Sequence, residues 1–130
     1  MLATWAADCA ERVLQLFEEV SPTDERPRAA INACRMWVRT GVFVMAEIRG
    51  ASLAAHAAAR TMPEKSAACF AARAAGQAVA TAHVPQHAFG AAYYALKAIA
   101  AADSAQAEVA VAQEQAWQVQ QISPSCGQKW

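Results

Sequence analysis

Three histidines, and a few polar residues near them, are the side chains in this sequence best suited to do chemistry. His56, His83 and His87 lie in an alanine-rich block, since 26 of the 36 alanines fall between Ala51 and Ala110. Imidazole titrates near neutral pH and can transfer protons. Arginine can hold a carboxylate or a phosphate. The candidates for ligand binding or proton transfer are therefore His56, Arg60, Arg73, His83, His87 and Tyr94.

Three interpretations of the histidines stay open. Each can be a hydrogen-bonded core or boundary residue, with His83 capping the carbonyls of a helix end. They can instead line a pocket, together with Arg60 or Arg73, that binds a small anionic ligand or moves protons. Finally, His56, His83 and His87 can bind a transition metal. No HExxH or Glu-x-x-His motif supports the metal site, so we expect no metal and no cofactor, with the three histidines as the weaker alternative.

Catalytic motifs are absent from the sequence. It contains no phosphate loop, no GxSxG and no dinucleotide fingerprint. Cys9, Cys34, Cys69 and Cys126 form no CxxC pair, and the first three lie in apolar helical stretches, which predicts buried, reduced thiols. No catalytic residue is assigned, and the pattern favours a non-enzymatic protein while leaving an enzyme open.

Length and charge restrict the class of protein. A chain of 130 residues fits one domain, and 11 basic against 11 acidic residues argue against a nucleic-acid binder. The N-terminus lacks the basic region of a signal peptide. The stretch from Ser66 to Ala102 is poor in charge, but it is built of alanine and is interrupted at Pro85, which argues against a membrane span. These features predict a cytoplasmic protein without a membrane or nucleic-acid partner.

Apolar residues recur at helical spacing throughout the chain. We predict an all-α fold, a compact single-domain bundle of about six helices over residues 1–122. An irregular tail is expected over residues 123–130. A homodimer stays possible, because the sequence does not decide whether the bundle pairs with a second copy. The expected helices are Trp5–Val20, Asp24 or Pro27 to Thr40, Val44–Thr61, Glu64–Ala82, Pro85–Ala102 and Ala105–Gln121.

The fourth and fifth expected helices are nearly uncharged on all sides, which predicts a central alanine-rich hairpin with its corner at Pro85. Gly76 and Gly90 lie in mid-helix and predict a close approach of another backbone or a ligand.

In the sixth helix, the apolar stripe from Ala105 through Ala112 to Val119 is expected to face the core. Trp5, Trp37 and Trp117 are expected to anchor helix contacts, and a partner contact stays open for Trp130 and the tail.

Five segments carry a resemblance to a known family, namely Trp5–Leu14, Arg26–Ile31, Ala54–Arg60, Ala72–Val84 and His87–Ala98, and it runs through Trp117-Gln118. The family that these segments resemble is the all-helical group of immunity proteins of bacterial toxin systems. The placements of His, Arg, Gly and Tyr carry it, because alanine-rich helices match one another easily. The chain departs from the family at Gly41-Val42-Phe43-Val44, where a more polar turn is expected, and in the tail with Cys126 and Trp130.

The resemblance implies that the protein neutralises a cognate toxin by direct binding inside the producing cell. It assigns no catalytic residues. We expect the binding surface on the exposed, charged parts of the first, second and sixth helices. The resemblance does not explain the polar residues of the alanine-rich block, so a small helical enzyme or ligand-binding protein stays open as the alternative.

Overall fold

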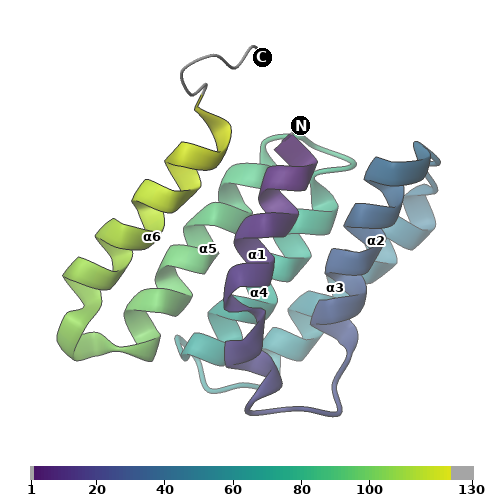
Figure 1. Cartoon of the computed structure of the whole chain (residues 1–130). Helices are drawn as coiled ribbons and strands as arrows, with labels where there is room; N and C mark the ends of the chain where they lie inside the picture. The colour runs from purple at the N-terminus through teal and green to yellow at the C-terminus, as the bar shows by residue number, and fades with distance from the viewer. Residues whose placement is uncertain (1, 124–130) are drawn as a thin grey trace.

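The computed structural model describes residues 2–123, which form six α-helices joined by short connections (Figure 1). In chain order they are α1 (Leu2–Glu18), α2 (Arg26–Thr40), α3 (Met45–Arg60), α4 (Ala67–Ala80), α5 (His87–Ala102) and α6 (Ala107–Ile122), with a short 3₁₀ turn at Ser104–Gln106. No strand occurs within this range. The predicted all-α, single-domain fold is confirmed.

Local chemistry explains where the helices begin and end. Gly41 ends α2 in the left-handed conformation, with φ +71°, and donates its N–H to the Trp37 carbonyl. The hydroxyl of Ser66 accepts the N–H of Cys69 and caps α4. α4 begins later than the predicted Glu64 because Lys65 has a φ of +62°, which a helix cannot include.

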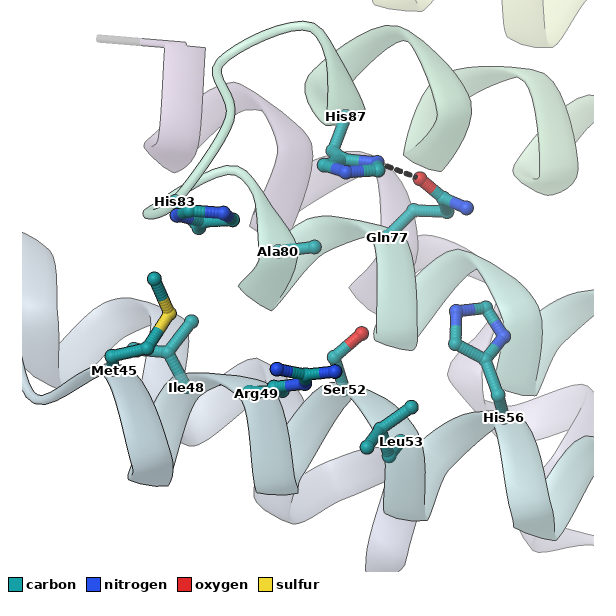
Figure 2. Close-up of a pocket in the computed structure, with 10 residues that line it drawn as sticks. All are labelled: Met45, Ile48, Arg49, Ser52, Leu53, His56, Gln77, Ala80, His83 and His87. Carbon is teal, nitrogen blue, oxygen red and sulfur yellow. Dashed lines mark hydrogen bonds between the residues drawn. The ribbon is translucent and has the colours of Figure 1, made fainter.

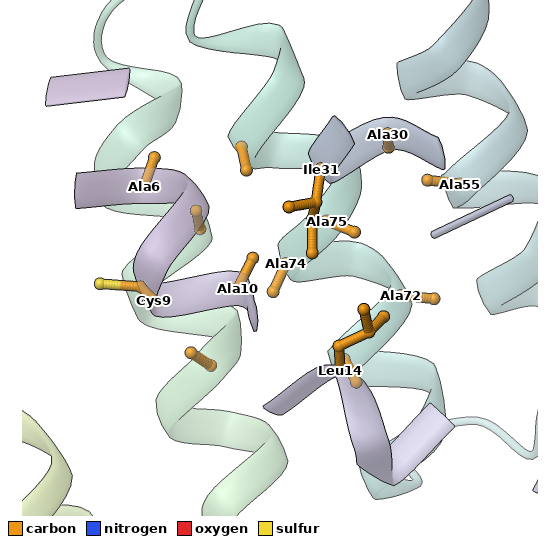
Figure 3. Packing of buried hydrophobic residues seen from close by; sticks show 14 of the residues in the cluster. Ala6, Cys9, Ala10, Leu14, Ala30, Ile31, Ala55, Ala72, Ala74 and Ala75 are labelled. Atoms are coloured by element: carbon orange, nitrogen blue, oxygen red, sulfur yellow. The ribbon is translucent and has the colours of Figure 1, made fainter. Parts of the chain in front are cut away.

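The innermost helix is α4, which contacts α1, α2, α3 and α5. Its alanines at positions 71, 72, 74, 75 and 78 are fully buried. Small side chains let the neighbouring backbones approach closely, as the packing around Ala10 and Ala74 shows (Figure 3). α5 contacts α1, α4 and α6, so the predicted central hairpin is confirmed. Its outer side nevertheless leaves Phe89 and Tyr93 exposed.

The orientation predicted for α6 is wrong. Val109, Ala112, Ala116 and Val119 face outward, whereas Glu114 and Gln118 are the buried residues of this helix. Polar partners on distant helices reverse the orientation that the apolar stripe favours. The Arg12 guanidinium donates two hydrogen bonds to the Glu114 carboxylate, at 2.7 and 2.9 Å. The Trp5 indole N–H donates to the backbone carbonyl of Gln118, and the side-chain amide of Gln118 donates to the backbone carbonyl of Ala92.

Removing the Glu114 carboxylate is expected to loosen α6. Glu114 is buried, but Arg12 is 43% exposed at its side chain. Water can therefore rehydrate the arginine, and we expect Glu114→Ala to lower the free energy of unfolding by about 1–2 kcal/mol rather than the 3–5 kcal/mol of a fully buried pair. Urea unfolding measures this change. Glu108→Ala, an exposed carboxylate on the same helix, is the control, and an equal effect of both substitutions would refute the anchoring role.

The tryptophans behave as predicted within the described residues. Trp5 is buried, and Trp37 and Trp117 pack half-buried against the core. The Arg12 guanidinium also stacks 4.0 Å above the Trp117 ring. Cys126 and Trp130 lie outside the described residues. Between residues 2 and 123, none of the helices has the length and apolar character needed to cross a membrane.

Candidate functional site

A cavity of about 390 Å³ lies between α3 and the corner that joins α4 to α5 (Figure 2). One wall is α3, and the other is the end of α4 with the start of α5. All three histidines line it. The complete lining is Met45, Ile48, Arg49, Ser52, Leu53, His56, Gln77, Ala80, His83 and His87.

The proline corner brings His83 and His87 to the same cavity. α4 ends at Ala80, and Pro85 lies in the turn before α5 begins at His87. The His83 ring stacks on Phe43, with 6.5 Å between ring centroids. The Nδ1 of His87 lies 2.7 Å from Oε1 of Gln77, and because that carbonyl oxygen only accepts, His87 donates. The turn thus orients two imidazoles that a continuous helix would place differently.

Arg73 determines the tautomer of His56. The guanidinium lies 2.9 Å from Nδ1 of His56 and can only donate, so Nδ1 accepts and a neutral ring carries its proton on Nε2. Figure 2 shows one ring nitrogen of His56 facing the cavity and the other turned away from it. The cavity-facing nitrogen is Nε2, because Nδ1 is occupied by Arg73. His56 therefore offers the cavity an N–H donor.

Two glycines make room for this arrangement. A Cβ at Gly76 would lie 2.7 Å from Nε2 of His56, and one at Gly90 would lie 2.7 Å from Oε1 of Gln77. Both glycines do have a close neighbour, but it is a side chain rather than the backbone or ligand that was predicted. Ser52 also donates its hydroxyl to the Gly76 carbonyl at 3.0 Å, which holds α3 against α4 at this level.

Burial lowers the pKa of His56 to about 4, and the positive charges of Arg73, Arg60 and His87 add to the shift. The folded protein thus holds this ring neutral at neutral pH. An unfolded histidine titrates near pH 6.5, so between about pH 6.5 and 4 the unfolded state binds the extra proton and stability falls as the pH falls.

We therefore expect protonation of His56 to decrease the free energy of unfolding by about 1–2 kcal/mol between pH 7 and pH 4.5. This decrease is smaller than the full pKa shift would give, because the ring is only half-buried and solvent screens its charge. His56→Gln keeps an acceptor for Arg73 and removes this titration, so its stability should depend less on pH than that of the parent protein. Urea unfolding at both pH values measures the difference. Parallel pH profiles of the two proteins would contradict the assignment.

Three of the six predicted site residues do not line the cavity. Arg60 is exposed at the end of α3, and Arg73 lies behind His56. Tyr94 stacks on Phe70, with 6.1 Å between centroids, because seven residues of helix carry it about 10 Å beyond His87. Sequence reasoning selected neither Arg49 nor Gln77, although Gln77 is one of the few polar residues in α4.

The three imidazoles share a cavity but do not converge on one point. Among residues 2–123, no group of three His, Cys, Asp or Glu side chains is placed to hold a metal ion. The physical reason is that Arg73 holds the His56 ring, Gln77 holds the His87 ring, and Phe43 stacks on His83. The three-histidine metal site that the sequence left open is therefore not formed.

The cysteines do not offer a nucleophile to this cavity. Cys9, Cys34 and Cys69 are buried free thiols, as predicted. Burial raises the pKa of Cys9 to about 12 and that of Cys34 to about 11, so both stay protonated at neutral pH. The cavity is thus a recess with apolar walls, the Nε2–H donor of His56 and one guanidinium, and its geometry suits binding.

The sequence model of the family described as "Imm-5 like putative immunity protein" matches residues 1–125. No curated protein and no solved structure matches the chain.

Proposed function

The chain belongs to the family of Imm-5-like immunity proteins, and from this premise we propose that it binds a toxin protein in the cytoplasm of the producing cell and holds that toxin inactive. The match spans nearly the whole chain, so the proposal concerns the entire bundle. A compact helical domain that offers a complementary surface is sufficient for such a role.

One surface favours contact with another protein. Val42, Phe43, Val44 and Met45 are four successive apolar residues that are each 41–65% exposed, and Leu53 on α3 is 58% exposed. Met45 and Leu53 line the cavity, Phe43 stacks on His83 beside it, and Val42 and Val44 belong to the segment that leads into α3. We call these five residues, together with the cavity, the α3 face. Exposed apolar residues beside a recess that holds a few polar groups are typical of interaction sites. This surface is the observation on which the placement of the binding site rests.

The charged parts of α1, α2 and α6, where the sequence placed the binding surface, largely satisfy one another. Arg28 pairs with Glu18, and Arg35 pairs with Asp8 and Glu11. These pairs link α1 to α2, just as Arg12 and Glu114 link α1 to α6. Charges that are already paired offer less to a partner, so we place the toxin-binding surface on the α3 face instead.

Co-expression tests the proposed function. The toxin domain encoded beside this gene in its native genome would be expressed in a bacterial host, with and without the protein. We expect the protein to restore growth and to elute with the toxin domain as a stoichiometric complex. Unchanged toxicity at confirmed expression of both proteins, together with no complex at micromolar concentration, would refute the proposal.

The three histidines around the cavity support a second candidate, a ligand-binding protein or small enzyme. In this proposal the imidazoles and Arg49 hold an anion or perform acid–base chemistry. A protein of this kind would act on its ligand without any toxin partner. Loss of a measurable ligand-dependent activity in a folded His56→Ala variant would support it, and an unaltered activity would count against it.

A further inference from the structure

We infer that the cavity of the α3 face is a carboxylate receptor, and that the proposed toxin partner inserts an acidic side chain, flanked by apolar residues, into it. This inference rests on the proposed function for the source of the carboxylate. The chemistry of the cavity supports it independently of that source.

The first argument is charge. No Asp or Glu lines the cavity, whereas the positively charged Arg49 does. Arg12, Arg26, Arg28 and Arg35 all form ion pairs, but Arg49 has no carboxylate partner among residues 2–123. The segment from residue 45 to residue 102, which contains the whole cavity lining, carries five Lys or Arg and only two Glu. An anionic group would thus meet attraction without nearby repulsion.

The second argument is the direction of the hydrogen-bond donors. Arg73 fixes the His56 ring so that Nε2–H faces the cavity. Gln77 accepts from Nδ1 of His87 and holds that ring as well, so a neutral His87 keeps Nε2 as an acceptor and its N–H serves Gln77 rather than the cavity. Arg49 adds a guanidinium, which matches the two oxygens of a carboxylate. Donors that are oriented before a ligand arrives lose little entropy on binding, which favours recognition of an acceptor group.

The third argument is size. A cavity of about 390 Å³ is far larger than a carboxylate, and Met45, Ile48 and Leu53 form much of its wall. The ligand must therefore carry an apolar body beside its charge. Because the exposed apolar residues Met45 and Leu53 line the cavity, an acidic residue within an apolar segment of a protein partner matches both features.

A titration with a small acid tests the receptor chemistry without any toxin. The probe is 3-phenylpropanoate, and its neutral amide is the matched control ligand. We expect the acid to shift the imidazole proton resonances of His56, His83 and His87 saturably, at about millimolar concentration, with the amide at least tenfold weaker. Arg49→Gln should weaken binding of the acid about fivefold, whereas Arg39→Gln, an exposed arginine of α2 outside the cavity, should not. Equal binding of acid and amide, or no shift with either, overturns the inference.

The toxin complex tests the source of the carboxylate. We expect Arg49→Glu to raise the Kd of the complex at least tenfold, and Arg39→Glu to change it less than twofold. A complex that forms normally with Arg49→Glu overturns the insertion of a toxin carboxylate while the proposed function stands. Binding of the acid without any toxin complex instead refutes the proposed function and identifies a receptor for small free acids.

Discussion

Replacing Ala74 with leucine is expected to destabilise the protein by about 3 kcal/mol, at the upper end of the usual cost of overpacking a core. Ala74 is fully buried on the innermost helix and faces Ala10 of α1, which is also fully buried (Figure 3). Three additional carbon atoms would have to push α1 away from α4. Because alanine buries little area per residue, the core depends on this close approach for its stability. Thermal and urea unfolding measure the loss.

Ala112→Leu is the matched control for this experiment. It makes the same change in a helix, but Ala112 is exposed on the outer side of α6. We expect its stability to stay within about 0.5 kcal/mol of the parent protein. If Ala74→Leu also stayed within that range, α4 would not be packed tightly in the centre of the bundle, and the close-packed core described here would be wrong.

Introducing a charge at Leu53 is expected to have the largest effect on function. Leu53→Glu places a carboxylate at the cavity wall, on an exposed apolar residue of the α3 face. It removes apolar contact area and repels an acidic partner, so we expect the Kd of the toxin complex to rise about a hundredfold, as for a central interface residue. Because Leu53 is 58% exposed, the free energy of unfolding should barely change.

Val119→Glu provides the comparison for Leu53→Glu. Val119 is 51% exposed on α6, outside the α3 face, so the same kind of charge is added at similar exposure. We expect protection against the toxin to persist with Val119→Glu and to fail with Leu53→Glu. The reverse pattern would move the binding surface to α6, and equal protection by both variants would leave the α3 face without a role in binding. Isothermal titration calorimetry and growth assays read out both variants.

The fold could be predicted from the sequence wherever the residues of a single helix determine how that helix is buried. The uncharged stretch around Pro85 predicted the central hairpin, because helices without charge pack inside a bundle, although the outer side of α5 stays exposed. The orientation of α6 could not be predicted in this way. Glu114 is buried because Arg12, 102 residues away in sequence, donates to it. Periodicity within one helix contains no information about a partner on another.

The candidate site was predictable in part for the same reason. The histidines stood out because they are polar residues in an apolar block, and the structure places all three around one cavity. Tyr94 shares a helix face with His87 but lies too far along the axis to reach the cavity. Arg49 was missed because a single arginine on an exposed helix face normally indicates solvation. Only the way α3 lies against α4 shows that it borders a recess.

Hydrogen–deuterium exchange of the protein alone and in its toxin complex tests the central claim, that the α3 face binds the toxin, most directly. Amide protection on binding reports which backbone segments the partner covers or stabilises. We predict that complex formation slows exchange in residues 42–56 and 83–87. Slowed exchange confined to α1 and α6, with residues 42–56 unchanged, would contradict the account.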